Sequence, residues 1–133
     1  MNANFAVSDV VLDASAVLAW IEREPGGEEV GARLLTASIS AVNLAEVVSK
    51  LIDKGLAPED ARLMAADLSC RVAHFDREAA LATGALRAKT AKYGLALGDR
   101  ACLQLASREG CAALTTDRAW ARVEIGVEIR MLR

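Results

Sequence analysis

The chain has 133 residues and a formal net charge of −2, with 53% hydrophobic and only 4% aromatic residues. This length suits one domain with a single core, which Ala, Leu, Val and Ile must build because aromatic residues are scarce. No apolar run approaches the roughly 18 residues of a membrane helix. Residues 1–5 lack the basic and apolar regions of a signal peptide, so we expect a cytoplasmic protein without membrane contact.

The first 35 residues predict one strand and two helices. Residues 10–12 form a β-branched apolar run with the length of a buried strand, and apolar residues at 17, 18 and 21 follow at helical spacing. Pro25-Gly26-Gly27 ends that helix. A second short helix is expected to place Val30, Leu34 and Leu35 on one face.

The middle of the chain continues the alternation. Residues 38–40 predict a second strand, after which Asn43 is expected to cap a helix that ends at Gly55. Pro58 suits the first turn of another helix, running to about residue 68. Residues 71–75 have the composition of a weak strand.

The last third predicts two helices and two strands. Asp76 is expected to cap a long Ala-rich helix over residues 77–93, and Gly98-Asp99 opens another helix that stops at Gly110. Residues 111–115 have strand composition. Residues 127–131 alternate apolar and charged side chains, which is typical of a half-exposed edge strand.

Strands separated by helices indicate an α/β fold. Right-handed crossovers give a mainly parallel sheet of four to five strands with helices on both faces, and no linker divides residues 1–133. Ligands of such sheets bind beyond the carboxyl ends of the strands. Asp13 and Asp117 each follow a predicted strand, so both are expected at that edge.

Four carboxylates stand among apolar or small residues. They are Asp13, Glu46, Asp99 and Asp117. Taken singly, each has an ordinary interpretation, because an Asp can cap a helix or shape a turn and a Glu can flank a helix. Taken as a set they lack nearby cations, apart from Arg100 and Arg118, and hard carboxylate oxygens suit Mg²⁺ or Mn²⁺.

The distribution of charge and the cysteine and histidine content limit the kinds of site that this chain can form. Residues 1–66 hold 5 Lys/Arg against 10 Asp/Glu, whereas residues 67–133 hold 11 against 8, as expected of an acidic cleft with basic surroundings or of unrelated solvated faces. Three cysteines without C-x-x-C spacing indicate buried thiols rather than zinc or disulfides. The single histidine, His74, excludes a two-histidine ribonuclease mechanism and is interpreted as structural.

Around the four carboxylates the chain contains, in this order, Val-Val-Leu-Asp-Ala-Ser-Ala, Asn-Leu-Ala-Glu-Val, Gly-Asp-Arg-Ala-Cys-Leu-Gln-Leu-Ala and Leu-Thr-Thr-Asp-Arg-Ala-Trp. These segments resemble, in the same order, those of PIN-domain nucleases, and most of all those of VapC-type toxins. The likeness spans nearly the whole chain, except about residues 55–75. It implies an Mg²⁺- or Mn²⁺-dependent endoribonuclease whose four carboxylates bind the metal.

The resemblance also implies roles for neighbouring residues. Ser15 and Thr115 fall at hydroxyl positions that in the family orient metal-bound water or phosphate, although they can equally cap a helix and finish a strand. Arg100 and Arg118 are candidates for holding RNA, with Arg87, Lys89 and Lys92 as further ones. Trp120 is expected in the core rather than stacked on a base, and Trp20 in the core or an interface.

The family resemblance implies partners as well. We expect a VapB-like antitoxin that holds the activity down, an RNA substrate and a homodimer. The alternatives are a stand-alone PIN-fold nuclease for RNA processing and a non-catalytic PIN-fold binding module. A phosphatase would have a second Asp where Ser15 stands, and a receiver domain would have paired acids and a Lys after its last strand, so phosphotransfer is disfavoured.

Overall fold

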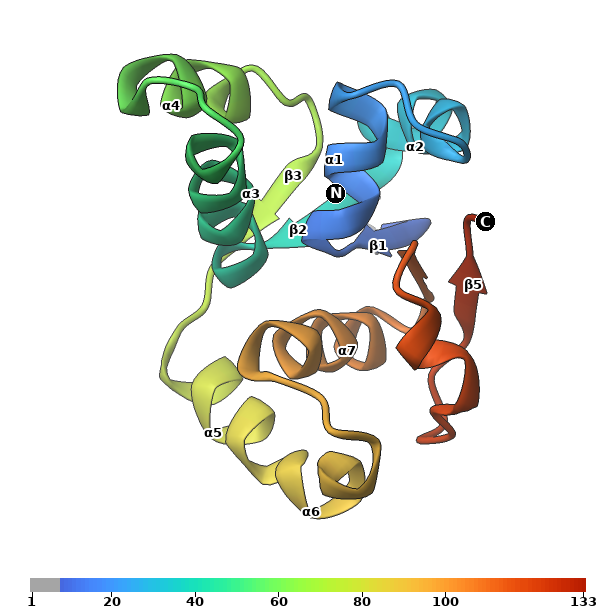
Figure 1. Ribbon diagram of the computed structural model, residues 1–133. Coiled ribbons are helices and arrows are strands. Elements are labelled where there is room, and N and C mark those ends of the chain that lie inside the picture. Colours follow the sequence, from blue (N-terminus) through green and yellow to red (C-terminus); the bar gives the residue numbers. More distant parts are fainter. Residues whose placement is uncertain (1–7) are drawn as a thin grey trace, which may run out of the picture.

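The structure is a computed structural model that describes residues 8–133, so the expectation about residues 1–5 lies outside it. Within this part of the chain, five strands form one sheet with only parallel pairings, in the order β3-β2-β1-β4-β5 (Figure 1). The strands are β1 Val10–Leu12, β2 Ala37–Ser40, β3 Arg71–Ala73, β4 Ala112–Thr115 and β5 Ile129–Met131. The predicted α/β fold is confirmed.

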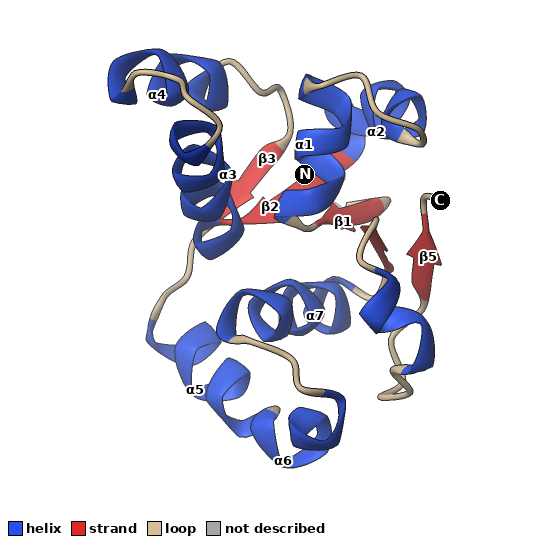
Figure 2. Ribbon diagram, in the orientation of Figure 1, coloured by secondary structure: helices blue, strands red, loops and turns tan. Residues whose placement is uncertain are grey.

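Helices connect the strands and cover both faces of the sheet. They are α1 Ala14–Ile21, α2 Gly27–Arg33, α3 Ala41–Asp53, α4 Pro58–Ala66, α5 Arg77–Ala85, α6 Arg87–Thr90 and α7 Leu97–Glu109, with single 3-10 turns η2 Leu34–Thr36, η3 Ala91–Tyr93 and η4 Arg118–Arg122. Helices α1 to α4 lie on one side of the sheet and α5 to α7 on the other (Figures 1 and 2). Within residues 8–133, no helix is long and apolar enough to cross a membrane.

The central strand β1 supplies both halves of the core. Val10 and Leu12 pack among α1, α3 and α4, whereas Val11 packs among residues of α7 and η4, including Trp120. Alternate residues of a strand point to opposite faces, and all three of these are fully buried. The sheet is therefore sandwiched, and its carboxyl edge is left for the site.

Three predicted details of the helices are wrong. Helix α3 is capped by Ser40, whose Oγ accepts from the Val42 amide, so Asn43 lies inside the first turn. Leu35 is exposed, because the chain turns into η2 before it. The helix expected over residues 77–93 is divided into α5, α6 and η3, and the Thr90 hydroxyl donates to the Leu86 carbonyl near the second break.

Element boundaries differ by small amounts elsewhere. Strand β3 ends at Ala73, β4 begins at Ala112 and β5 begins only at Ile129. Helix α7 begins at Leu97, one residue before the predicted Gly98. Hydrogen bonding to a neighbouring strand decides where each strand ends, and the alternation of side chains does not encode it.

Candidate active site

Asp13 lies at the carboxyl edge, where β1 passes into α1. As the N-cap of α1, its Oδ1 accepts from the Ala16 amide (2.8 Å) and from the Ser15 hydroxyl (2.7 Å). Its Oδ2 accepts from the Thr115 hydroxyl of β4 at 2.5 Å. The residue is only 5% exposed, so its carboxylate is fixed from both sides and nearly removed from solvent.

The hydroxyls of Ser15 and Thr115 join the first strand–helix turn to the end of β4. The Ser15 Oγ accepts from the Thr116 amide (2.9 Å), and the two hydroxyl oxygens lie 3.2 Å apart. Thr115 Oγ1 in turn accepts from the Asp117 amide (2.9 Å). Both predicted hydroxyl residues therefore contact Asp13 or its partners, and neither merely finishes an element.

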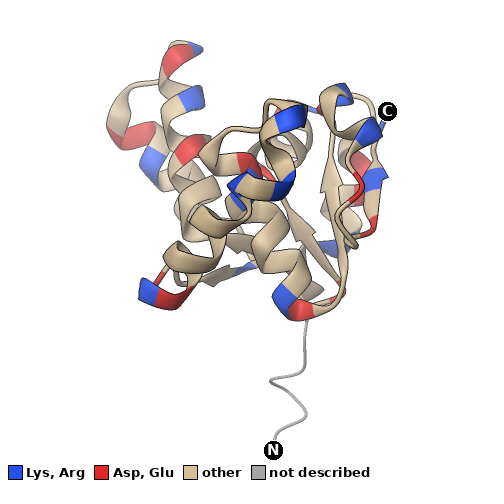
Figure 3. Ribbon diagram, turned by 90° about the horizontal axis from the view of Figure 1, so that it is seen from below, with Lys and Arg blue, Asp and Glu red and all other residues tan. Residues whose placement is uncertain are grey.

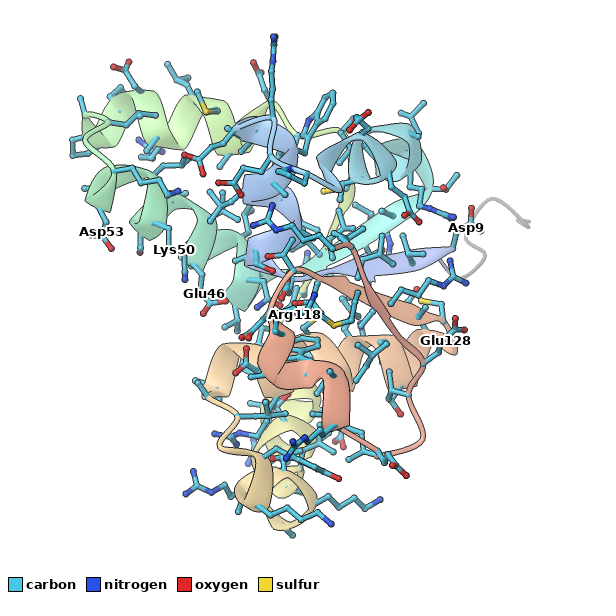
Figure 4. The ribbon with its side chains drawn as sticks, turned by 45° about the vertical axis from the view of Figure 1, so that its right-hand side comes forward. Asp9, Glu46, Lys50, Asp53, Arg118 and Glu128 are labelled. Atoms are coloured by element: carbon cyan, nitrogen blue, oxygen red, sulfur yellow. The ribbon has the colours of Figure 1, made fainter. Side chains whose placement is uncertain are left out.

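Glu46 approaches this edge from α3. Its Oε1 accepts from Asn43 Nδ2 at 2.8 Å, and the same nitrogen donates to the Gly98 carbonyl of α7 at 3.0 Å. Figure 4 shows Glu46, Lys50 and Asp53 along one flank of α3, with Glu46 nearest to α7. Asn43 is 1% exposed, so it forms a buried link between the two helices.

Asp99 and Asp117 use their side chains locally. Asp99 lies in the first turn of α7, and its Oδ2 accepts from the Ala96 amide at 2.9 Å. Asp117 is the exposed N-cap of η4, and its Oδ1 accepts from the Ala119 amide at 2.9 Å. Asp99, expected as an N-cap, thus lies at the third position of α7 and bonds back to the N-cap residue, whereas Asp117, expected in a turn, caps η4.

Two pKa shifts describe the electrostatics of the site. Burial raises the pKa of Asp13 from 3.8 to about 6; the hydrogen bonds from Thr115, Ser15 and Ala16 oppose this, and the charge of Asp99 adds to it. Burial also raises the pKa of the Cys102 thiol, and the charges of Asp13, Asp99 and Glu46 raise it further. The pKa of this buried thiol on α7 therefore responds to the charges of all three carboxylates.

The donor chemistry fits a hard divalent cation. Within residues 8–133, no ion pair joins any of the four carboxylates to Lys or Arg. In the same range, no three Asp, Glu, His or Cys side chains converge closely enough to hold a metal ion. A buried carboxylate with no cationic partner is costly, which Mg²⁺ or Mn²⁺ would relieve. To share a metal ion with Asp13, the side chains of Asp99 and Asp117 would have to give up their hydrogen bonds to the Ala96 and Ala119 amides and rotate.

The arginine, tryptophan and histidine residues singled out in the sequence differ in how exposed they are to solvent. Arg100 is half-buried and donates to the Thr83 carbonyl of α5 (3.2 Å), whereas Arg118 is exposed and donates to the Arg133 carbonyl (3.0 Å). Trp120 is fully buried and so cannot stack on a base, whereas Trp20 is 40% exposed. His74 is exposed beyond the end of β3.

Sequence reasoning missed Asn43 and Gly98 as site residues. Both meet Glu46, and a Cβ at Gly98 would overlap the Glu46 carboxylate. The spacing of Asn43 and Glu46, three residues apart on a helix, was the signal that could have indicated their contact. No sequence spacing of this kind connects Gly98, on α7, with Glu46 on α3.

Comparisons with known proteins agree with this architecture. The model of the PIN domain family matches residues 10–126. A DNA-bound VapBC from Salmonella typhimurium is similar at 23% identity, covering 95% of this chain and 99% of that chain, with a TM-score of 0.72. VapC20 from Mycobacterium tuberculosis, a Sarcin-Ricin loop cleaving toxin, is similar at 15% identity, with coverages of 90% and 98% and a TM-score of 0.70.

A third structure extends the same likeness. VapBC2 from Rickettsia felis, bound to a DNA fragment from its promoter, is similar at 20% identity, with coverages of 92% and 97% and a TM-score of 0.68. No curated protein matched. At these identities the likeness establishes the fold, and the resemblance found in the four sequence segments is confirmed at that level.

Proposed function

The chain belongs to the PIN domain family, and from this premise we propose that it is an endoribonuclease that requires Mg²⁺ or Mn²⁺ and acts as the toxin of a toxin–antitoxin pair. The observation that carries the proposal is the setting of Asp13. This carboxylate is buried at the carboxyl edge of the sheet, where the charge of Asp99 raises its pKa and no cation is paired to it within residues 8–133.

Asp13, Glu46, Asp99 and Asp117 would hold the metal. One or two divalent ions bound there supply a water activated for attack and positive charge for the scissile phosphate. The hydroxyls of Ser15 and Thr115 fix the orientation of Asp13, since each donates to one of its carboxylate oxygens. Thr115 also accepts from the Asp117 amide, so one hydroxyl connects two of the proposed ligands.

A basic face beside the site would hold the RNA backbone. We define this face by its exposed residues Arg87, Lys89, Lys92, Arg118 and Arg122. No Asp or Glu occurs among residues 79–98, and no ion pair within residues 8–133 involves these five cations. The Tyr93 hydroxyl accepts from the Glu124 amide and ties η3 to the segment after η4. Figure 3 looks onto the α5–α6 side of the molecule.

An antitoxin partner is proposed for the opposite layer. A groove of about 470 Å³ runs between α1 and α4, lined by Trp20, Ile21, Leu34, Met64 and Leu68 among others. Trp20 and Met64 are each 40% exposed there. Several similar structures are VapBC complexes, which supports a VapB-like partner for this chain, and we propose this groove as the surface that the partner covers. We further propose that the chain forms a homodimer, which sedimentation of the purified protein tests directly.

The test of the activity is incubation of the purified, antitoxin-free protein with total bacterial RNA in Mg²⁺, Mn²⁺ or EDTA, with sequencing of new RNA ends. Discrete metal-dependent cuts are expected from the wild type and none from Asp13→Asn. Asp53→Asn is the matched control, because Asp53 is an exposed carboxylate on the same flank of α3 as Glu46 (Figure 4). Absence of cutting by the folded wild type, or cutting by Asp13→Asn, contradicts the proposal.

A further inference from the structure

We propose that Asn43 and Gly98 are positioning residues that hold the Glu46 carboxylate in place before any metal binds. The inference rests on the proposed function, because it concerns one ligand of the proposed metal site. It adds two residues that lack any charge of their own and that act only through Glu46.

The Asn43 amide can face Glu46 and Gly98 in one orientation only. Both of its partners, Glu46 Oε1 and the Gly98 carbonyl, are acceptors, so the NH₂ group must point to them, with one N–H for each. The Oδ1 atom then lies on the other side, buried and without a hydrogen-bond partner among the described residues. The two donated bonds therefore set the orientation of this amide.

Gly98 provides the space that the Glu46 carboxylate occupies. The three atoms nearest to a Cβ built on Gly98 are Cδ, Oε1 and Oε2 of Glu46, all close enough to overlap it. The backbone of Gly98 does not have a positive φ, so its conformation does not require glycine. A Cβ at this position would therefore displace the end of the Glu46 side chain from its present place.

The two contacts distinguish Glu46 from Asp99 and Asp117, whereas Asp13 is likewise held by residues of two elements. Asp99 and Asp117 are hydrogen-bonded to the first turns of their own helices. Glu46 is instead held between helices, by Asn43 on its own helix and against Gly98 on α7. Glu46 is therefore preorganised, and a metal that binds loses less free energy to ordering this side chain.

The experiment is calorimetric titration of the metal-free full chain with Mn²⁺ alone, without RNA. Gly98→Ala is the main variant, since the added methyl group meets the Glu46 carboxylate. Gly84→Ala in α5 is the matched control, because a Cβ there meets nothing within 4 Å. Glu46→Gln and the double variant Glu46→Gln/Gly98→Ala complete a double-mutant cycle. Asn43→Ala replaces Gly98→Ala in the same cycle if that variant does not fold.

Gly98→Ala is expected to weaken Mn²⁺ binding by about 10- to 100-fold, the usual effect of losing support for a metal ligand, and Gly84→Ala to leave it unchanged. In the Glu46→Gln background, Gly98→Ala should cause no further loss. Wild-type affinity in Gly98→Ala, or an equal loss in both backgrounds, overturns the positioning role while the metal site stands. A wild type that does not bind Mn²⁺, or a Glu46→Gln variant that binds as tightly as wild type, overturns the metal site and this inference together.

Discussion

Replacing Asp13 by Asn is expected to stabilise the metal-free fold at neutral pH while abolishing cleavage. The buried carboxylate carries a charge in a nearly solvent-free place, and its pKa is about 6 instead of 3.8. An asparagine would keep the Oδ1 bonds from Ser15 and the Ala16 amide, and its NH₂ would face the Thr115 hydroxyl, which can also accept. The amide would ligate a hard cation poorly.

The sign and size of the change in the free energy of unfolding follow from the linkage between protonation of Asp13 and folding. An acid with a raised pKa contributes stability that is complete below pH 3.8 and is lost as the pH rises through about 6. The full loss is about 3 kcal/mol, and roughly half of it falls between pH 5 and pH 7.5. The free energy of unfolding of Asp13→Asn, relative to wild type, should therefore rise by about 1 kcal/mol between these two pH values.

Urea unfolding in EDTA at pH 5 and at pH 7.5 measures this difference, with Asp53→Asn as the exposed control that should show no such change. Adding Mg²⁺ at pH 7.5 should then stabilise the wild type and not Asp13→Asn, because a ligand stabilises only the fold that binds it. A difference between Asp13→Asn and wild type that is the same at both pH values would refute the reasoning from burial.

Three other outcomes follow from the site and its surroundings. EDTA should stop RNA cleavage, and Mg²⁺ or Mn²⁺ should restore it, as sequencing of RNA ends in each condition would show; cleavage in EDTA would mean that the four acids have another role. Thr115→Val removes the donor to Asp13 and the acceptor of the Asp117 amide, so it should lower the free energy of unfolding by about 1–3 kcal/mol in urea titrations, and an unchanged midpoint would contradict this. Lys89→Ala and Lys92→Ala should each weaken RNA binding and reduce the slope of log affinity against log salt by about 1, with Mn²⁺ affinity unchanged; an unaltered slope would remove the basic face from the substrate path.

Patterns local in sequence predicted the sheet and the position of Asp13 at its carboxyl edge. The apolar run ending at Asp13 and the one ending at Thr115 become neighbouring strands, because parallel strands separated by helices bring their carboxyl ends to one edge. The contact between Asp13 and Thr115 was therefore foreseeable from topology. Whether Asp99 and Asp117 serve as caps or as ligands was not, since both roles use an acid at the same place.

Contacts between distant helices were not predictable from local patterns. Asn43 is suited both to capping a helix and to bonding within its first turn, and Ser40 three residues earlier took the cap. The sequence indicates Gly98 only as the start of a helix. Its lack of a side chain matters because α3 approaches α7 and places the Glu46 carboxylate where a Cβ would lie. Leu35 has the right helical spacing to be buried, yet the turn at η2 exposes it.

The bond between Asp13 and Thr115 has a consequence for biosynthesis. These residues are 102 positions apart in the chain, and the central strand gains its partner β4 only after everything between them has been made. A ribosome-bound chain can pair β1, β2 and β3 while it still lacks both Thr115 and Asp117. For a protein proposed to cut RNA, a nascent chain without these two residues lacks one hydrogen-bond donor to Asp13 and one proposed metal ligand.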